Sequence, residues 1–267
     1  MGKVQTLRGM CGQRTRKRGN YGTICAMAGE TTKTRGIVLA IRPWSQTSHV
    51  VSWLTPDAGV VSTVVKGAMR PKSAFLGQYD LFYECELVYY TRERGDAHAI
   101  REVSPLKMRD GLRGRWRETS LAGYAAGLAQ RLAPASGESS GWYELLDGLY
   151  DRLCQGAPEL DAELLSLELG ALRLAGLAPD LSGFDPRQEW QPFAIDLGRY
   201  GEGNRTARLS RGAATALRAP FSENSRNFVL DALRFIGVFY AFHLDLPADV
   251  RRSVVQMAAK NKEQRKR

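Results

Sequence analysis

The sequence predicts an α+β protein with more than one domain, in which a five-stranded β-barrel precedes an all-helical domain with a small irregular or β insertion. Apolar residues alternate in short runs up to Pro105, and beyond it they recur every three to four residues, as in helices. The length of 267 residues also exceeds that of most single domains. The expected parts are a disordered basic extension, the barrel, the helical domain and a basic tail, at residues 1–33, 34–107, 108–258 (insertion 181–206) and 259–267.

Five short runs rich in Val, Ile and aromatic residues are the expected strands. Turn residues such as Pro43, Pro56 and Gly59 separate them, and they cover residues 36–42, 50–55, 60–66, 80–90 and 98–103. In the fourth run, one face carries Leu81, Tyr83, Cys85, Leu87 and Tyr89, and the other, solvated face carries Glu84 and Glu86. Five strands with an aromatic-bearing face and basic loops are typical of the oligonucleotide/oligosaccharide-binding (OB) fold, a partly open barrel.

Amphipathic stripes predict helices in the second domain. The first three cover residues 116–132, 142–153 and 160–174, and they end before Pro134, Gly156 and Gly176. Ser210 is expected to cap a short helix that reaches Arg218, and Ser222 the last long helix. This last helix is apolar on more than one side, which predicts a place at the centre of the bundle. The insertion is expected to be stabilised by Phe184, Trp190 and Phe193, without metal.

The net charge of +10 is unevenly distributed. Residues 1–35 hold eight Lys or Arg and one acid, and residues 259–267 hold five and one, so residues 36–258 have a net charge of −1. The basic extension is expected to be an additional DNA-binding arm or a dispensable segment, with Met27 as an alternative start. The basic tail is expected to be a frayed helix end or a DNA contact. Nucleic acid bound by the folded part therefore requires a local patch of cations.

The cysteines and histidines argue against a metal site. Cys11, Cys25, Cys85 and Cys154 lie far apart without a C-x-x-C pair, and the three histidines are isolated, so we expect neither disulfides nor any metal or other cofactor. The sequence has no P-loop, GxGxxG, H-E-x-x-H or nucleophile-elbow motif, and an enzyme is not predicted. No apolar run reaches membrane-spanning length, and the expected location is the cytoplasm.

Cations in one predicted loop are the strongest candidates for a binding site. Lys66, Arg70 and Lys72 follow the third strand, and no acid lies between Lys66 and Gln78 to neutralise them. Neighbouring strands and strand ends are expected to add Arg35, Arg42, Arg92, Arg94 and Arg101. If these cations converge on one side of the barrel, they would follow a phosphate backbone.

Aromatic residues of the barrel are candidates for stacking bases. They are Trp44 and Trp53, or the pair Tyr89 and Tyr90. Aromatic residues in barrel strands also fill the core. Burial is expected for Trp53, whereas Trp44, beside Pro43 at a strand end, could take either role.

Three segments resemble the RecO family of bacterial recombination mediators: RPWSQTS, LTPDAGVVSTVVKGAMRPKS and LELGALRLAGLAPDL. The resemblance is dense over residues 34–107 and patchier over residues 108–258. It implies an OB-fold domain and a helical domain that bind single- and double-stranded DNA, anneal single strands and associate with the nucleoid. It also implies that the protein acts together with a RecR-like protein and helps RecA to displace single-strand-binding protein. Many similar proteins carry two zinc-binding Cys pairs where residues 181–204 have no Cys.

The resemblance implies a second site in the helical domain, for the acidic, Phe-ending tail of single-strand-binding protein. Such a pocket needs apolar walls and one or two arginines for a carboxylate, and the candidates are Arg131, Arg152 and Arg173. The pair before LEL, often basic in similar proteins, is Leu165 and Ser166, so Arg173 could compensate. Two other functions stay open: an RNA-binding OB-fold protein of translation or RNA processing, and a structural adaptor that binds no nucleic acid.

Overall fold

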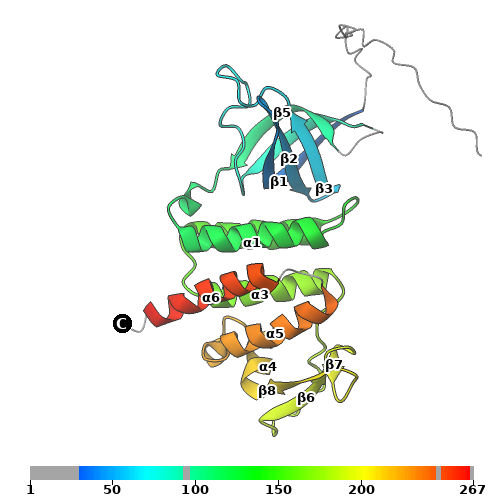
Figure 1. The fold of residues 1–267 in the computed structure, drawn as a ribbon, viewed down its shortest axis with the longest axis vertical. Helices are drawn as coiled ribbons and strands as arrows, with labels where there is room; N and C mark the ends of the chain where they lie inside the picture. Colours follow the sequence, from blue (N-terminus) through cyan, green and yellow to red (C-terminus); the bar gives the residue numbers. More distant parts are fainter. Residues whose placement is uncertain (1–29, 93–96, 245–247, 265–267) are drawn as a thin grey trace, which may run out of the picture.

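The computed structural model describes residues 30–92, 97–244 and 248–264, with Ala248 and the last five residues described by their backbone only. Most of the predicted basic extension, Arg94 and the end of the basic tail therefore lie outside the described residues. The described part is layered, with the barrel at the top of Figure 1, helices beneath it and a small sheet at the bottom.

Five strands close into a barrel in the order β1-β2-β3-β5-β4, which confirms the predicted OB-like domain. They are β1 (Thr31–Ser45), β2 (Ser48–Thr55), β3 (Gly59–Val65), β4 (Glu84–Tyr90) and β5 (His98–Lys107). Their inward residues form one buried cluster that includes Val38, Trp53 and Leu87. Branched and aromatic side chains fill such an interior well, which is why these short runs form strands.

Several predicted strand boundaries are wrong: the first strand extends at both ends, the second begins earlier, the fourth begins later and the fifth ends later than expected. The sequence pattern assigns residues 31–33 to the extension, whereas they pair with the end of β4. The fourth strand begins at Glu84 rather than at residue 80, because Phe82 has a φ of 68°, which interrupts the extended backbone. Leu81 is therefore 43% exposed. The other predicted inward residues of this run, Tyr83, Cys85, Leu87 and Tyr89, are buried.

Six α-helices follow in the described part of the chain. They are α1 (Trp116–Leu132), α2 (Ser140–Gln155), α3 (Leu160–Leu174), α4 (Arg211–Arg218), α5 (Val229–His243) and α6 (Ala248–Gln264). The first three agree with the predicted ranges to within two residues. The predicted cap of α4 is also confirmed, since the Ser210 hydroxyl accepts a hydrogen bond from the Ala213 N–H at 3.0 Å.

The start of α5, the presence of α6 and the identity of the central helix differ from the prediction. Ser222 precedes a 3-10 turn, Glu223–Ser225, and α5 begins only at Val229. The pattern also does not predict α6 as a separate helix. The central helix is α3, which contacts α1, α2, α5 and α6, whereas α5 leaves Phe242 half exposed. The sequence does not reveal the central position of α3, because acidic residues usually indicate an exposed helix face. Here Glu168 is completely buried in an ion pair with Arg251.

The insertion folds into a three-stranded sheet in the order β7-β6-β8. Its strands are β6 (Trp190–Ala194), β7 (Arg199–Tyr200) and β8 (Thr206–Ser210). Phe193 is completely buried, and Phe184 packs against the helical core, as predicted. The role predicted for Trp190 is wrong, because this side chain is 48% exposed on the other face of β6.

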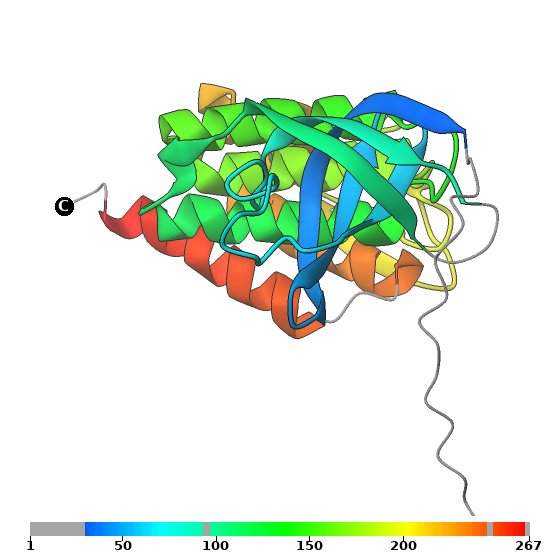
Figure 2. The same cartoon turned by 90° about the horizontal axis from the view of Figure 1, so that it is seen from above.

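The barrel and the helices share a hydrophobic core. The barrel contributes Ile37, Leu39 and Leu54, which are buried in one cluster with residues of the helices. Seen from above, the barrel strands lie across the helices (Figure 2). One side of the barrel is thus covered, and its far end is left for other contacts.

The turn between β2 and β3 is a sensitive part of this junction. The Val60 N–H donates to the Pro134 carbonyl oxygen at 2.9 Å, and a Cβ on Gly59 (φ 71°) would collide with that oxygen. We expect Gly59→Ala to lower the free energy of unfolding by about 3 kcal/mol or more, measured by chemical denaturation. Gly77 is a matched control, because it has a φ of 75° in open space. Gly77→Ala should cost only about 1–2 kcal/mol, and equal losses would contradict the clash.

Candidate nucleic-acid interface

The loop between β3 and β4 closes the far end of the barrel. Phe75 and Tyr79 pack against the cluster inside the barrel, and the Tyr79 hydroxyl lies 2.8 Å from Nδ1 of His49. Burial raises the pKa of Tyr79 to about 12, so its hydroxyl stays protonated at neutral pH. These contacts anchor the middle of the loop, and its first residues lie on the surface.

The first part of the loop lies against the hairpin between β1 and β2. The Met69 N–H donates to the Thr47 carbonyl oxygen at 3.1 Å, and the Gly67 N–H donates to the Ser48 hydroxyl at 3.2 Å. Gly67 has a φ of 69°, which suits a glycine at this turn. The contacts bring Lys66 and Arg70 beside Trp44, at the end of β1.

Two neighbouring hollows lie along this loop. The first, of about 390 Å³, is lined by Trp44, Lys66 and Arg70 among others. The second, of about 360 Å³, shares Lys66 and Arg70 and adds Lys72 and Phe75. Among the described residues, none of the three cations has a carboxylate partner within ion-pair distance. The hollows therefore offer positive charge that the protein itself does not neutralise.

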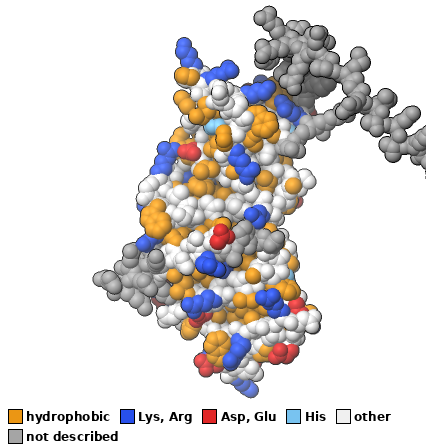
Figure 3. All heavy atoms as spheres, in the orientation of Figure 1, with side chains coloured by type: hydrophobic (Ala, Val, Ile, Leu, Met, Phe, Trp, Pro, Cys, Tyr) orange, Lys and Arg blue, Asp and Glu red, His pale blue; other side chains and the backbone are white. Residues whose placement is uncertain are grey.

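Other predicted cations lie at varying distances from this loop. Arg42 is exposed on β1, opposite Val50 of β2. Arg92 is exposed at the end of β4, where its N–H donates to Nδ1 of His98 at 3.1 Å. The end of β4 pairs with Thr31, so Arg92 lies at the other end of β1 from Trp44. We call the following set the rim: Arg42, Trp44, Lys66, Arg70 and Lys72. Figure 3 shows Lys and Arg side chains over this end of the molecule.

Two of the candidate stacking residues are core residues. Trp53 is completely buried, as predicted, and its Nε1 donates to the Thr63 hydroxyl at 2.8 Å. Tyr89 is also buried. Trp44, in contrast, is 67% exposed, and Tyr90 is partly exposed. Trp44 is thus the aromatic residue that combines exposure with a position beside the loop cations.

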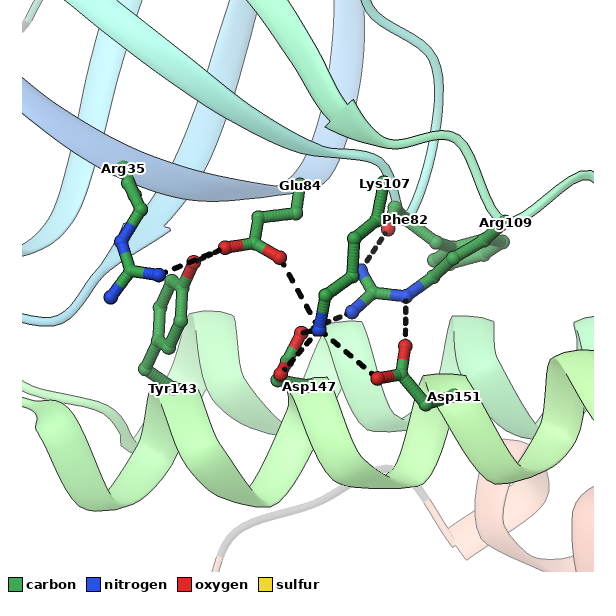
Figure 4. Close-up of polar contacts among 8 residues, drawn as sticks. All are labelled: Arg35, Phe82, Glu84, Lys107, Arg109, Tyr143, Asp147 and Asp151. Atoms are coloured by element: carbon green, nitrogen blue, oxygen red, sulfur yellow. Dashed lines mark hydrogen bonds and ion pairs between the residues drawn. The ribbon is translucent and has the colours of Figure 1, made fainter.

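Arg35 lies at the junction with the helical domain and not at the rim. Its Nη1 is 3.5 Å from Oε1 of Glu84, and its guanidinium lies over the ring of Tyr143 (Figure 4). Glu84 is buried and accepts a hydrogen bond from the Tyr143 hydroxyl at 2.7 Å. The expectation that solvation alone explains Glu84 is therefore wrong, because α2 covers this face of β4. Arg101 forms an exposed ion pair with Glu102 at 3.1 Å.

The junction contains a wider network of charges (Figure 4). Nζ of Lys107 lies 2.8 Å from Asp147 and 3.0 Å from Asp151. The buried Arg109 contacts both aspartates, and it donates to the Phe82 carbonyl oxygen at 2.6 Å. The sequence signal for this network is the spacing of Tyr143, Asp147 and Asp151, because residues four apart line one face of a helix. That signal does not reveal what covers the face.

The three arginines proposed for tail binding have different surroundings. Arg152 is held by Glu163, with N–O distances of 3.0 to 3.1 Å. Arg131 and Arg173 are exposed in the last turns of α1 and α3. Neither has a carboxylate partner among the described side chains, so these two are available to an acidic partner.

The described residues contain no group of three or more His, Cys, Asp or Glu side chains that could hold a metal ion. None of the helices in the described ranges is long and apolar enough to cross a membrane.

Comparison with known proteins agrees with the resemblance. The family model described as "Recombination protein O N terminal" matches residues 27–109, and that described as "Recombination protein O C terminal" matches residues 113–252. The DNA repair protein RecO of Anaeromyxobacter sp. (strain K) is 34% identical over 57% of this chain and 59% of its own length. The proteins of the same name from Geobacter metallireducens and Lactobacillus delbrueckii subsp. bulgaricus are 30% and 26% identical, over 55% and 58% of this chain. The chain thus spans 59–61% of these relatives' lengths. Since the two models together match most of its length, the chain belongs to the RecO family.

Proposed function

We propose that this protein is a DNA repair and recombination mediator that binds single-stranded DNA at the rim and anneals complementary strands. The observation that carries the proposal is the group of Lys66, Arg70 and Lys72 beside the exposed Trp44, without carboxylate partners among the described residues. Lys and Arg neutralise phosphates without reading sequence, and an exposed indole stacks on any base. A strand held by its backbone and one base face keeps its pairing edges free, which is what annealing requires.

The partners of this activity are part of the same proposal. Membership in the family and the names of the relatives support a role in DNA repair and recombination. Within this role we propose that the protein acts on DNA coated by single-strand-binding protein, where it assists RecA together with a RecR-like partner. Double-stranded DNA, the annealed product, would bind the same cations. Arg131 and Arg173 are the candidates for the acidic tail of single-strand-binding protein, and Arg152 is not, because Glu163 already holds it. We propose no catalytic step, and we propose that the protein acts at the nucleoid.

Replacing Lys66, Arg70 and Lys72 together by Ala is expected to weaken binding of single-stranded DNA with little dependence on sequence. Each lost phosphate contact should lower the slope of log K against log salt by about 0.7, so the triple variant should lose about 2 in slope. Fluorescence anisotropy with a labelled oligonucleotide, repeated over a salt series, measures both quantities. Annealing of coated complementary strands should fall in parallel.

The matched control removes equal charge from the helical domain, by replacing the exposed Arg226, Arg234 and Arg252 with Ala. This control should keep the salt slope close to that of the unchanged protein. Equal slopes in the rim variant and the unchanged protein would remove this loop from the binding site. An RNA oligonucleotide of the same sequence tests the RNA-binding alternative, since a preference for RNA would indicate contacts to the 2′-hydroxyl.

A further inference from the structure

The outer face of the small sheet carries an exposed aromatic residue that core packing does not explain. Phe193 and Leu209 point into the helical core and are completely buried. Pro192 pairs with Arg208 and Trp190 pairs with Ser210, so these four residues share the opposite face. Trp190 is half exposed there. Pro192 is also exposed, so the two side chains give this face an apolar patch with Arg208 beside it, and apolar patches bordered by polar residues mark interaction sites.

Arginines accompany the aromatic residues on this part of the surface. The Arg208 guanidinium lies over the Trp190 ring, with Cζ 5.4 Å from the ring centroid. The guanidinium of Arg205, in contrast, lies over the half-exposed Phe242 ring of α5 at 5.8 Å, away from Trp190. Such pairs hold the guanidinium against the ring while its N–H groups still point to solvent.

The charge around this face is also positive. Residues 187–211 hold five Arg and three acids, although residues 36–258 as a whole have a net charge of −1. One of the acids, Asp196, accepts hydrogen bonds from the Asn204 and Arg205 N–H groups. Within the described part of the chain, Arg205 and Arg208 have no carboxylate within ion-pair distance. Figure 3 shows Lys and Arg side chains among hydrophobic ones over the lower end of the molecule, with acidic side chains beside them.

We propose that the outer face of β6 and β8 is a second surface for single-stranded nucleic acid, on which Trp190 stacks a base and Arg208 binds a phosphate. A strand face with one exposed indole and a neighbouring guanidinium group suits a planar base followed by a phosphate. This surface lies at the opposite end of the molecule from the rim, with the helices between them (Figure 1). It goes beyond the proposed function, which requires only the rim. One molecule could then hold two strands at once.

The test uses the full chain and a labelled oligothymidylate, in a background in which Lys66, Arg70 and Lys72 are already Ala. Adding Trp190→Leu and Arg208→Gln should lower the remaining affinity by roughly tenfold, the size of one lost base stack with its phosphate contact. Photocrosslinking of the unchanged protein to an oligonucleotide with 5-iodouracil should also give an adduct on the peptide that contains Trp190.

A second exposed pair supplies the control. Trp116, on α1, is 63% exposed, and the Arg117 guanidinium lies 5.3 Å from its ring. The variant with Trp116→Leu and Arg117→Gln should leave the affinity unchanged, and circular dichroism should show that both variants are folded. The proposal is overturned if the sheet variant binds as well as its background, if both variants lose the same affinity, or if crosslinks fall only on barrel peptides. Crosslinks on Trp190 would support it even if the rim variant itself showed no loss.

Discussion

Replacement of Arg251 by Met is expected to lower the free energy of unfolding by about 3–5 kcal/mol, because it leaves a buried carboxylate without its partner. Glu168, in the middle of α3, is completely buried, and each of its oxygens lies 2.8 Å from a guanidinium nitrogen of Arg251 on α6. The Tyr124 hydroxyl donates to the same carboxylate at 2.7 Å. Burial raises the pKa of Glu168 in spite of the opposing effect of Arg251, so the charge depends on these contacts.

Thermal unfolding followed by circular dichroism measures this effect. A loss of about 3–5 kcal/mol in a chain of this size corresponds to a fall in Tm of roughly 6–20 °C. The control is the double variant with Arg251→Met and Glu168→Leu, which removes the buried charge together with its partner. It should recover much of the stability, because replacing both members of a buried ion pair with apolar residues is often close to neutral. A double variant as unstable as the single one would assign the loss to packing of α6.

Replacement of Arg109 by Met is expected to cost about 2–4 kcal/mol and to loosen the barrel against the helices. Arg109 is buried at the junction, where it contacts Asp147 and Asp151 of α2 and donates to the Phe82 carbonyl oxygen at 2.6 Å. Without it, Lys107 alone neutralises the two aspartates, and the Phe82 carbonyl oxygen loses its donor. The junction joins strand ends to a helix from another part of the chain, so its loss acts on both domains.

Chemical denaturation gives the loss of stability, and hydrogen exchange shows where it acts. Faster exchange is expected for amides of β4 and α2, while the distant sheet of β6 to β8 keeps its protection. The control is Lys33→Ala, which breaks the exposed ion pair of Lys33 with Glu86 at 3.0 Å. Exposed pairs contribute about 0–1 kcal/mol, so a loss in this control as large as that for Arg109→Met would contradict a special role for the buried junction.

The elements that the sequence predicts correctly are those with a local cause. The strands of the barrel follow from alternation and turn residues, and the first three helices from a helical period that ends at Pro or Gly. The cap of α4 is equally local, since Ser210 lies three residues before its partner Ala213. The interruption at Phe82 has no such signal, because a φ of 68° is unusual for Phe and depends on its tertiary contacts.

In the candidate interface, too, the sequence predicts some residues correctly and tertiary contacts decide the role of the others. Lys66, Arg70 and Lys72 lie within seven residues and face one region because consecutive turns fold this stretch on itself. In these turns the Arg70 N–H donates to the Gly67 carbonyl oxygen and the Ser73 N–H donates to that of Arg70. Trp44 joins them only through the contact between that loop and the β1–β2 hairpin. Arg35 and Arg152 look equally available in the sequence, yet each lies beside a carboxylate that folding brings to it.

The sequence by itself determined the order of most elements, the set of barrel strands and the basic loop, because these depend on neighbouring residues and on the period of apolar positions. Only the tertiary structure decided which polar faces are covered. Alternation places Glu84 on the outer face of the barrel, but only packing against α2 makes that face an interior. In the same way, α3 is central because a distant Arg251 neutralises Glu168, and Trp190 is exposed because Phe193 and Leu209 already fill the core beneath its sheet. The chemistry of a side chain determines whether it needs a hydrogen-bonding, charged or apolar partner. The packing of segments that are distant in the sequence determines whether solvent or protein provides that partner.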